Sequence, residues 1–103
     1  MIKKISDLTE KEKAAFFRAS LDEMARNYGA SKTVVKQKMQ DELDRAYSDA
    51  GFARMNPDNR IDMAYLRRDF KKKPSLEDYL IWMTKFVTHS DSVEIPDESL
   101  DNI

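Results

Sequence analysis

Apolar residues recur at every third or fourth position along the first part of the chain, a spacing that predicts an amphipathic helix. Thr9 followed by Glu12 has the spacing of a capping box, in which each side chain bonds the other residue's backbone at a helix start. Gly29 stands directly after the periodic run, where a left-handed residue ends many helices. We therefore expect a helix over residues 10–28. Its apolar stripe consists of Phe17, Leu21, Met24, Ala25 and Tyr28.

Three further periodic runs predict three further helices. Ser31 is placed to cap one over residues 32–49, which we expect Gly51 to close with a left-handed residue. The others cover residues 59–72 and 76–88, and the last has the clearest stripe. No segment alternates polar and apolar residues over the length of a strand, and no internal repeat occurs. The chain is therefore expected to be all-α, a small bundle of about four helices.

Charge divides the chain near residue 90. Residues 1–90 carry all 18 Lys and Arg and 14 of the 19 Asp and Glu, a net charge of +4, whereas residues 91–103 carry five acidic residues and no base. The C-terminal stretch has too few apolar residues to offset the entropy of ordering it. We expect one helical domain over residues 1–90, followed by a flexible, disordered acidic tail over residues 91–103.

Several classes of chemistry lack the residues that they require. The chain has no Cys, a single His and two Gly, which excludes a disulfide, a thiolate metal site and a glycine-rich phosphate loop. His89 stands next to the predicted tail, where a catalytic base would be hard to position. We expect no enzymatic activity, no cofactor and no metal. No apolar run reaches the ~18 residues of a membrane span, so we expect a cytoplasmic protein without membrane contact.

Residues 21–40 carry a spacing of small and apolar residues that brings two helices together across a tight turn. Ala25 is small, Gly29 turns the chain, and Val35 follows six residues later. This run resembles the helix-turn-helix of bacterial and phage DNA-binding regulators. The resemblance implies a small DNA-binding regulator whose second helix enters the major groove of duplex DNA. The outward residues that would then contact DNA are Lys32, Thr33, Lys36, Gln37 and Gln40.

A second group of basic residues lies at the end of the third predicted helix. Cations at this position complement the helix dipole, which by itself explains a solvated helix end. The same cations form a compact patch that can contact phosphates, and DNA affinity would then fall steeply with salt. This basic cluster consists of Arg67, Arg68, Lys71, Lys72 and Lys73.

A different class of function fits the same composition. The chain can be a helical protein-interaction adaptor or inhibitor, of the kind that phages and other mobile elements encode, which acts by binding a partner protein. Phe16, Ile81 and Trp82 fall beside the main apolar stripes, and exposed aromatic residues are common at the centre of interfaces. We interpret Phe16 as the margin of the core, and a homodimer through the fourth helix is a further option. The sequence ranks DNA binding first and the adaptor second.

Overall fold

Five α-helices and a two-stranded ribbon make up residues 1–96, the part of the chain that the computed structural model describes. The ribbon pairs β1 (Ile2–Lys4) with β2 (Ser92–Glu94) in antiparallel register. The all-α class and the four long helices are confirmed, and a short fifth helix is added. The helices are α1 (Glu10–Tyr28), α2 (Lys32–Ala46), α3 (Asp49–Ala53), α4 (Pro57–Asp69) and α5 (Leu76–Thr88).

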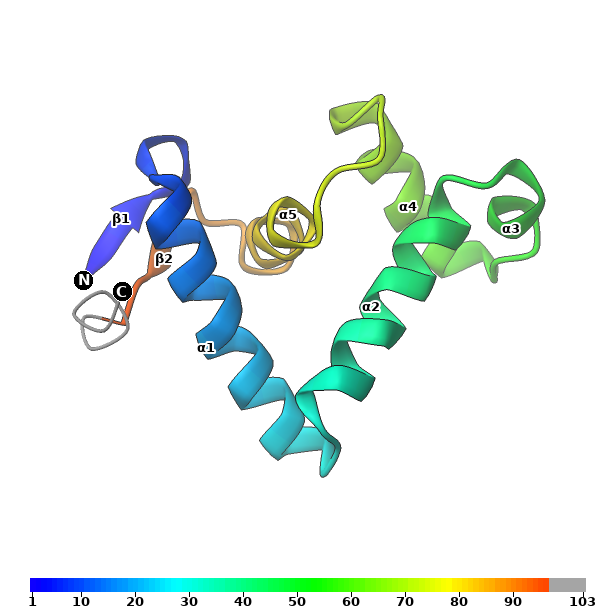
Figure 1. The fold of residues 1–103 in the computed structure, drawn as a ribbon. Coiled ribbons are helices and arrows are strands. Elements are labelled where there is room, and N and C mark those ends of the chain that lie inside the picture. Colours follow the sequence, from blue (N-terminus) through cyan, green and yellow to red (C-terminus); the bar gives the residue numbers. More distant parts are fainter. Residues whose placement is uncertain (97–103) are drawn as a thin grey trace.

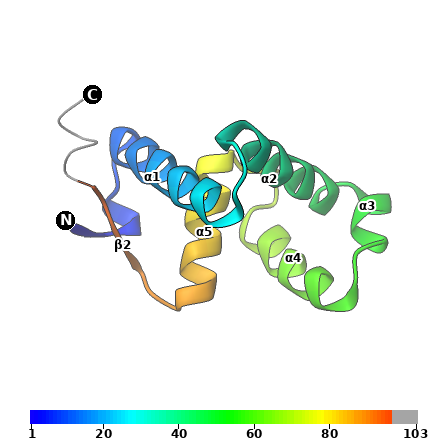
Figure 2. The same ribbon diagram turned by 90° about the horizontal axis from the view of Figure 1, so that it is seen from below.

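The two longest helices form a V (Figure 1). α1 and α2 are its arms and meet at Gly29, α5 lies between the arms, and α3 and α4 lie beside the far end of α2. The view from below shows that the start of α5 lies between the two arms and that the helix then runs away from α2 (Figure 2). The main core fills the space between α1, α2, α4 and α5, because each of these helices turns its apolar face inward. Its most deeply buried side chains are Leu43, Ala46, Leu66 and Tyr79.

The start and end of α1 follow the local signals in the sequence. The Thr9 side chain accepts from the backbone N–H of Glu12, and the Glu12 carboxylate accepts from the backbone N–H of Thr9, as a capping box requires. Gly29 adopts the left-handed conformation with φ 62°, and Ser31 caps α2 by accepting from the N–H of Val34. Both predicted bounds of this helix, and the start of the next, are confirmed.

The predicted end of the second helix is wrong. α2 ends at Ala46 rather than at residue 49, because the Ser48 side chain caps a separate short helix, α3, by accepting from the N–H of Gly51. Gly51 is not a left-handed terminus. A Cβ there would lie 2.9 Å from the carbonyl oxygen of Arg45, so this glycine permits a close backbone approach instead.

α4 begins earlier and ends earlier than residues 59–72. Asn56 caps it, and Pro57 occupies its first position, where the missing N–H costs no hydrogen bond. The helix ends at Asp69 because the backbone of Phe70 is extended. The Phe70 carbonyl oxygen accepts a hydrogen bond from the hydroxyl of Tyr47, the residue that directly follows α2. A tertiary contact therefore sets this boundary, whereas α5 has the predicted bounds.

Residues 91–96 correct the prediction of a flexible acidic tail. β2 pairs with β1, and Val93 and Ile95 are buried against Ala15 of α1. The two apolar residues alternate with polar ones, so the ribbon turns one face inward, but the alternation is too short to identify a strand from the sequence. The remainder of the predicted tail, residues 97–103, lies outside the described residues.

Candidate nucleic-acid interface

The tip of the V, residues 18–40, consists of the last part of α1, a short turn and the first part of α2. A turn of three residues joins α1 to α2, and its left-handed Gly29 reverses the chain. Val35 and Met39 are buried and hold α2 against α1 and α5, while Ala25 is half-buried and packs against the same core. The residues assigned to helix packing therefore do pack, and residues 32–34 and 36–38 of α2 are exposed to solvent.

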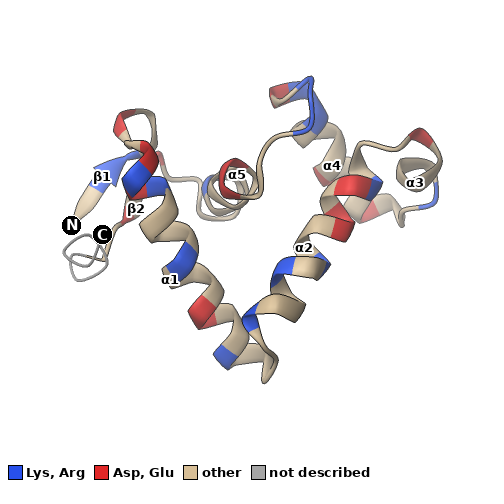
Figure 3. Ribbon diagram, in the orientation of Figure 1, with Lys and Arg blue, Asp and Glu red and all other residues tan. Residues whose placement is uncertain are grey.

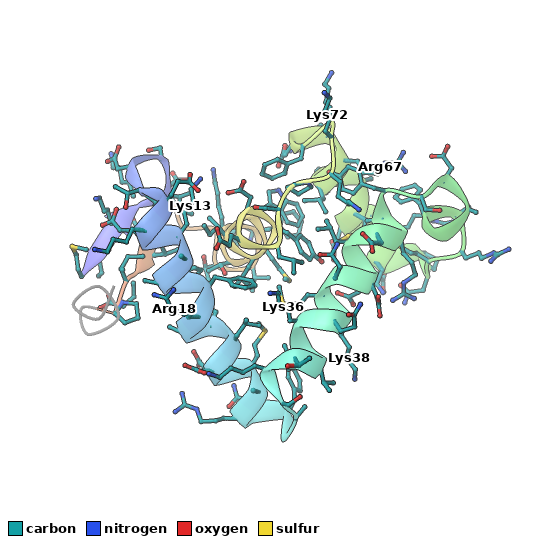
Figure 4. All side chains as sticks on the ribbon, viewed as in Figure 1. Lys13, Arg18, Lys36, Lys38, Arg67 and Lys72 are labelled. Atoms are coloured by element: carbon teal, nitrogen blue, oxygen red, sulfur yellow. The ribbon has the colours of Figure 1, made fainter. Side chains whose placement is uncertain are left out.

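The predicted reading residues of α2 are accessible at the tip. Lys32, Thr33, Lys36 and Gln37 are exposed, and Gln40 is half-buried. Figure 4 shows Lys36 and Lys38 leaving the helix on different sides, Lys36 toward the inside of the V. Such an exposed helix start presents backbone N–H groups and the positive end of the helix dipole, both of which favour an approaching anion.

Charge is distributed unevenly between the tip and the rest of α2. Residues 18–40 carry five basic and two acidic side chains, a net charge of +3, whereas residues 41–49 carry one basic and four acidic side chains. Figure 3 shows this change of sign along the α2 arm. The carboxylates that would repel a phosphate backbone therefore lie in the half of α2 that is remote from the tip.

Two basic residues of α1 extend the tip and were missed by the sequence analysis. Arg18 and Arg26 line, together with Lys32, a shallow groove of about 680 Å³ beside the junction of the two helices. Both arginines are exposed. Their spacing of eight residues, about two helical turns, puts them on one side of α1. This spacing is visible in the sequence, but the helix-turn-helix resemblance points only to the second helix.

Several of the predicted DNA-contacting side chains already have acidic neighbours. Lys32 forms an ion pair with Asp22. The Gln37 side-chain amide donates to the carboxylate of Asp41 at 3.0 Å, and the Gln40 amide donates to Asp44 at 2.9 Å. Exposed interactions of this kind contribute only about 0–1 kcal/mol, so an incoming phosphate or base can replace them at low cost.

Lys36 differs from these residues. Among residues 1–96 no carboxylate lies within ion-pair distance of its ammonium, and Thr33 beside it is likewise exposed. Lys36 is therefore the predicted reading residue whose charge is most available to a ligand.

The basic cluster is not brought to the tip. Lys72 projects at the open end of the V, opposite the tip (Figure 4). Arg67 pairs with Asp49 at 3.2 Å and lies over the ring of Phe52, and Arg68 pairs with Asp69 at 3.2 Å. These pairs use the arginine charges within the body of the protein.

Lys73 of the basic cluster is also engaged. Its ammonium lies 2.7 Å from the carboxylate of Asp44, and hydrogen bonds from Lys73 and Gln40 lower the pKa of that carboxyl group. Lys71 and Lys72 have no carboxylate within ion-pair distance in the described part of the chain. The expectation that the whole cluster adds to one DNA surface finds no support in its placement.

The residues of the adaptor hypothesis are not an exposed patch. Ile81 and Trp82 are only 5% and 8% exposed, and the Trp82 indole N–H donates to the carboxylate of Asp69 at 2.8 Å. Phe16 is half-buried at the core margin, as interpreted. The prediction of exposure is wrong for α5 because this helix lies between the two arms of the V and is covered on more than one side.

Three general findings complete the site. No group of acidic, His or Cys side chains among residues 1–96 is arranged to hold a metal ion. Within the same residues, every helix is too short or too polar to cross a membrane. Comparison of the chain with protein-family models, with curated proteins and with solved structures found no match in any of the three.

Proposed function

We propose that this chain is a small DNA-binding protein that inserts the start of α2 into the major groove of duplex DNA. The observation that carries the proposal is the exposed, basic tip of the V, which has a net charge of +3 and a short left-handed turn between its helices. An α-helix with its side chains is about 10–12 Å across, which matches the ~12 Å width of the major groove.

The side chains at the tip divide between two tasks. Lys36 and Thr33 lie on the exposed flank of α2, where a lysine can reach guanine acceptors and a hydroxyl can bond a base or a phosphate. Arg18, Arg26 and Lys32 line one groove beside the turn and are placed to contact the phosphate backbone. Gln37 would exchange its bond to an exposed carboxylate for a bond to a base edge, which leaves the donor satisfied in both states.

The acidic half of α2 limits how far the helix enters the groove. Asp41 and Asp44 follow directly after the reading residues and are exposed. Only about the first two turns of the helix can lie against phosphates without charge repulsion, which agrees with recognition by the N-terminal part of the second helix. The remaining turns would point out of the groove, toward α3 and α4.

The test compares two lysine reversals that change the net charge equally. Lys36→Glu places a carboxylate on the proposed reading flank, and Lys38→Glu places one on the other side of the same helix. Binding is measured by fluorescence anisotropy with a labelled pool of random duplexes at low salt, and circular dichroism verifies that both variants fold. Because Lys36 would face phosphates and bases directly, we expect Lys36→Glu to weaken binding by at least about tenfold.

Lys38→Glu is expected to retain most of the affinity. In addition, Arg26→Gln should lower the slope of log affinity against log salt by about 1, the change for one lost phosphate contact. Equal retention of Lys36→Glu and the wild type on DNA at low salt would refute the proposal. Equal losses in the two reversals would also contradict it, since they would show only a general response to charge.

A further inference from the structure

Five methionines line a pair of adjoining pockets, together called the methionine groove, and Lys38 of α2 lines one of the two. The groove has two adjoining parts of about 410 and 360 Å³, which share Glu42 and Met83 in their walls. α1, α2 and α5 form the first part, and α2, α4, α5 and the loop before α4 form the second. The methionines of this methionine groove are Met24, Met39, Met55, Met63 and Met83, which include every methionine of the chain except Met1.

The walls of the methionine groove are open to solvent. All but one of its methionines are half-buried, and Met39 alone is buried. Three apolar or aromatic side chains at its edges are exposed to solvent: Tyr28 is 75%, Val34 46% and Val87 70% exposed. Exposed apolar side chains that gather around a pocket are a feature of interaction sites, whereas single ones are ordinary. Methionine side chains are unbranched and polarizable, so they adjust to the shape of an apolar partner better than branched side chains do.

The charges around the methionine groove indicate the sign of what binds there. Lys38, Arg45 and Arg54 line it, and no carboxylate within residues 1–96 lies within ion-pair distance of any of the three. The carboxylates in the walls, Glu42 and Asp62, are fewer than the cations. In contrast, three of the five members of the basic cluster, Arg67, Arg68 and Lys73, already form ion pairs with carboxylates.

The walls also indicate the form of the occupant. They are built from helices and a loop, and the strand edges of the described residues lie at the other side of α1, so an added β-strand has no edge to pair with here. An amphipathic helix satisfies its own backbone and offers apolar side chains at every third or fourth position, which suits an apolar groove between helices.

We propose that the methionine groove binds an amphipathic helix of a partner protein, with the apolar face of that helix on the methionines and acidic residues on its flanks. Lys38 contacts acidic residues at one part of the groove, and Arg45 and Arg54 contact them at the other. The surface is distinct from the proposed DNA surface, because Lys36 and Lys38 leave α2 on different sides (Figure 4). The protein can therefore hold a partner helix and a DNA duplex together.

The test selects helical peptides that share a fixed apolar face and have randomised flanking positions. We expect the full chain to recover peptides with Asp and Glu at the flanks. Peptides with the same face and lysine flanks should bind at least about tenfold more weakly. The methyl NMR signals of the five groove methionines should shift on binding, since each is in the proposed contact surface.

Matched variants assign the binding to the groove. Val34→Asp puts a carboxylate at the groove edge and should weaken the selected peptides by at least about tenfold. The new charge repels the acidic flanks of the peptides and competes with them for Lys38, one helical turn away. Ile61→Asp makes the same change at an exposed apolar residue outside the groove, 58% exposed, and should leave the affinity unchanged. Lys36→Glu should also leave it unchanged, so a failure of the DNA proposal does not affect this result.

Three outcomes would overturn the proposal. The first is selection of peptides with basic flanks, and the second is peptide binding that Val34→Asp does not weaken. The third is a wild-type dimer in sedimentation that Val34→Asp dissociates, which would show that a second copy of the chain covers the groove.

Discussion

Replacing Asp69 by alanine should destabilise the protein through the hydrogen bond that joins α4 to α5. The Trp82 indole N–H donates to this carboxylate at 2.8 Å, and the tryptophan is 8% exposed, so its donor has little access to water once the carboxylate is removed. A hydrogen bond to a charged group contributes about 1.5–3 kcal/mol. The Asp69 side chain is itself 41% exposed, and solvent screening reduces the effect, so we expect a loss of about 1–2 kcal/mol.

The size of this loss should depend on pH in a defined direction. The hydrogen bond from Trp82, followed by that from Arg68, lowers the pKa of Asp69 below its ordinary value of 3.8. A group whose pKa is lower in the folded state stabilises the fold above its unfolded pKa and loses this contribution as the pH falls through the folded pKa. The difference between wild type and Asp69→Ala should therefore be constant near neutral pH and shrink below about pH 4.

Urea unfolding followed by far-ultraviolet circular dichroism measures both effects, because this signal is also present in variants that lack Trp82. Asp69→Asn is the control, because its side-chain oxygen still accepts the indole N–H, and we expect it to lose less stability than Asp69→Ala. A double-mutant cycle with Trp82→Phe should give a coupling energy of about 1 kcal/mol, since the phenyl ring retains packing but has no donor. A loss below about 0.3 kcal/mol in Asp69→Ala, or a pH-independent difference, would refute the reasoning.

Two further substitutions test the fold at places where it departs from the sequence analysis. Ile95→Ala should lower the free energy of unfolding in urea by about 2–4 kcal/mol, because Ile95 is fully buried. Val87→Ala, at an exposed position, should lower it by less than about 0.5 kcal/mol. Equally small effects of the two substitutions would contradict the packing of β2 on α1. Gly51→Ala should lower the melting temperature through a loss of about 1–3 kcal/mol, because its Cβ would lie 2.9 Å from a backbone carbonyl oxygen; an unchanged or higher melting temperature would contradict this close approach.

The features that were predicted correctly depend on residues close together in the chain. The capping box of Thr9 and Glu12, the left-handed Gly29 and the N-cap of Ser31 each involve groups within four residues of one another. Such signals operate in any tertiary setting, because the helix end itself supplies the groups that they bond. For this reason α1 and the start of α2 have their predicted bounds.

The features that were predicted incorrectly depend on distant neighbours. Gly51 was expected to be a left-handed terminus, but it is a glycine because the backbone of Arg45 approaches it. Trp82 was expected at an edge, but α5 lies between two other helices and is covered on more than one side. Val93 and Ile95 belong to a stretch whose composition favours disorder, and they are buried because β1 and α1 supply a surface for them.

The candidate DNA surface likewise has some features that follow from local sequence and others that depend on distant neighbours. Residue types and helical spacing identified Lys36 and its neighbours as outward-facing, since the faces of a helix follow from its period alone. Which cations remain without a carboxylate depends on the meeting of separate elements, as for Lys73 with Asp44 and Arg67 with Asp49. Arg18 and Arg26 join the tip only because α1 and α2 converge there.

By itself, the sequence determined the helical class, most helix starts and the outward faces of the helices, because these follow from propensity, capping and periodicity within a few residues. The tertiary structure decided which helices are buried on more than one side and which cations form ion pairs with carboxylates. It also brought five methionines that are far apart in the chain together in the methionine groove. These properties depend on which elements meet, and the free energy of burial and pairing is set by neighbours that lie far apart along the chain.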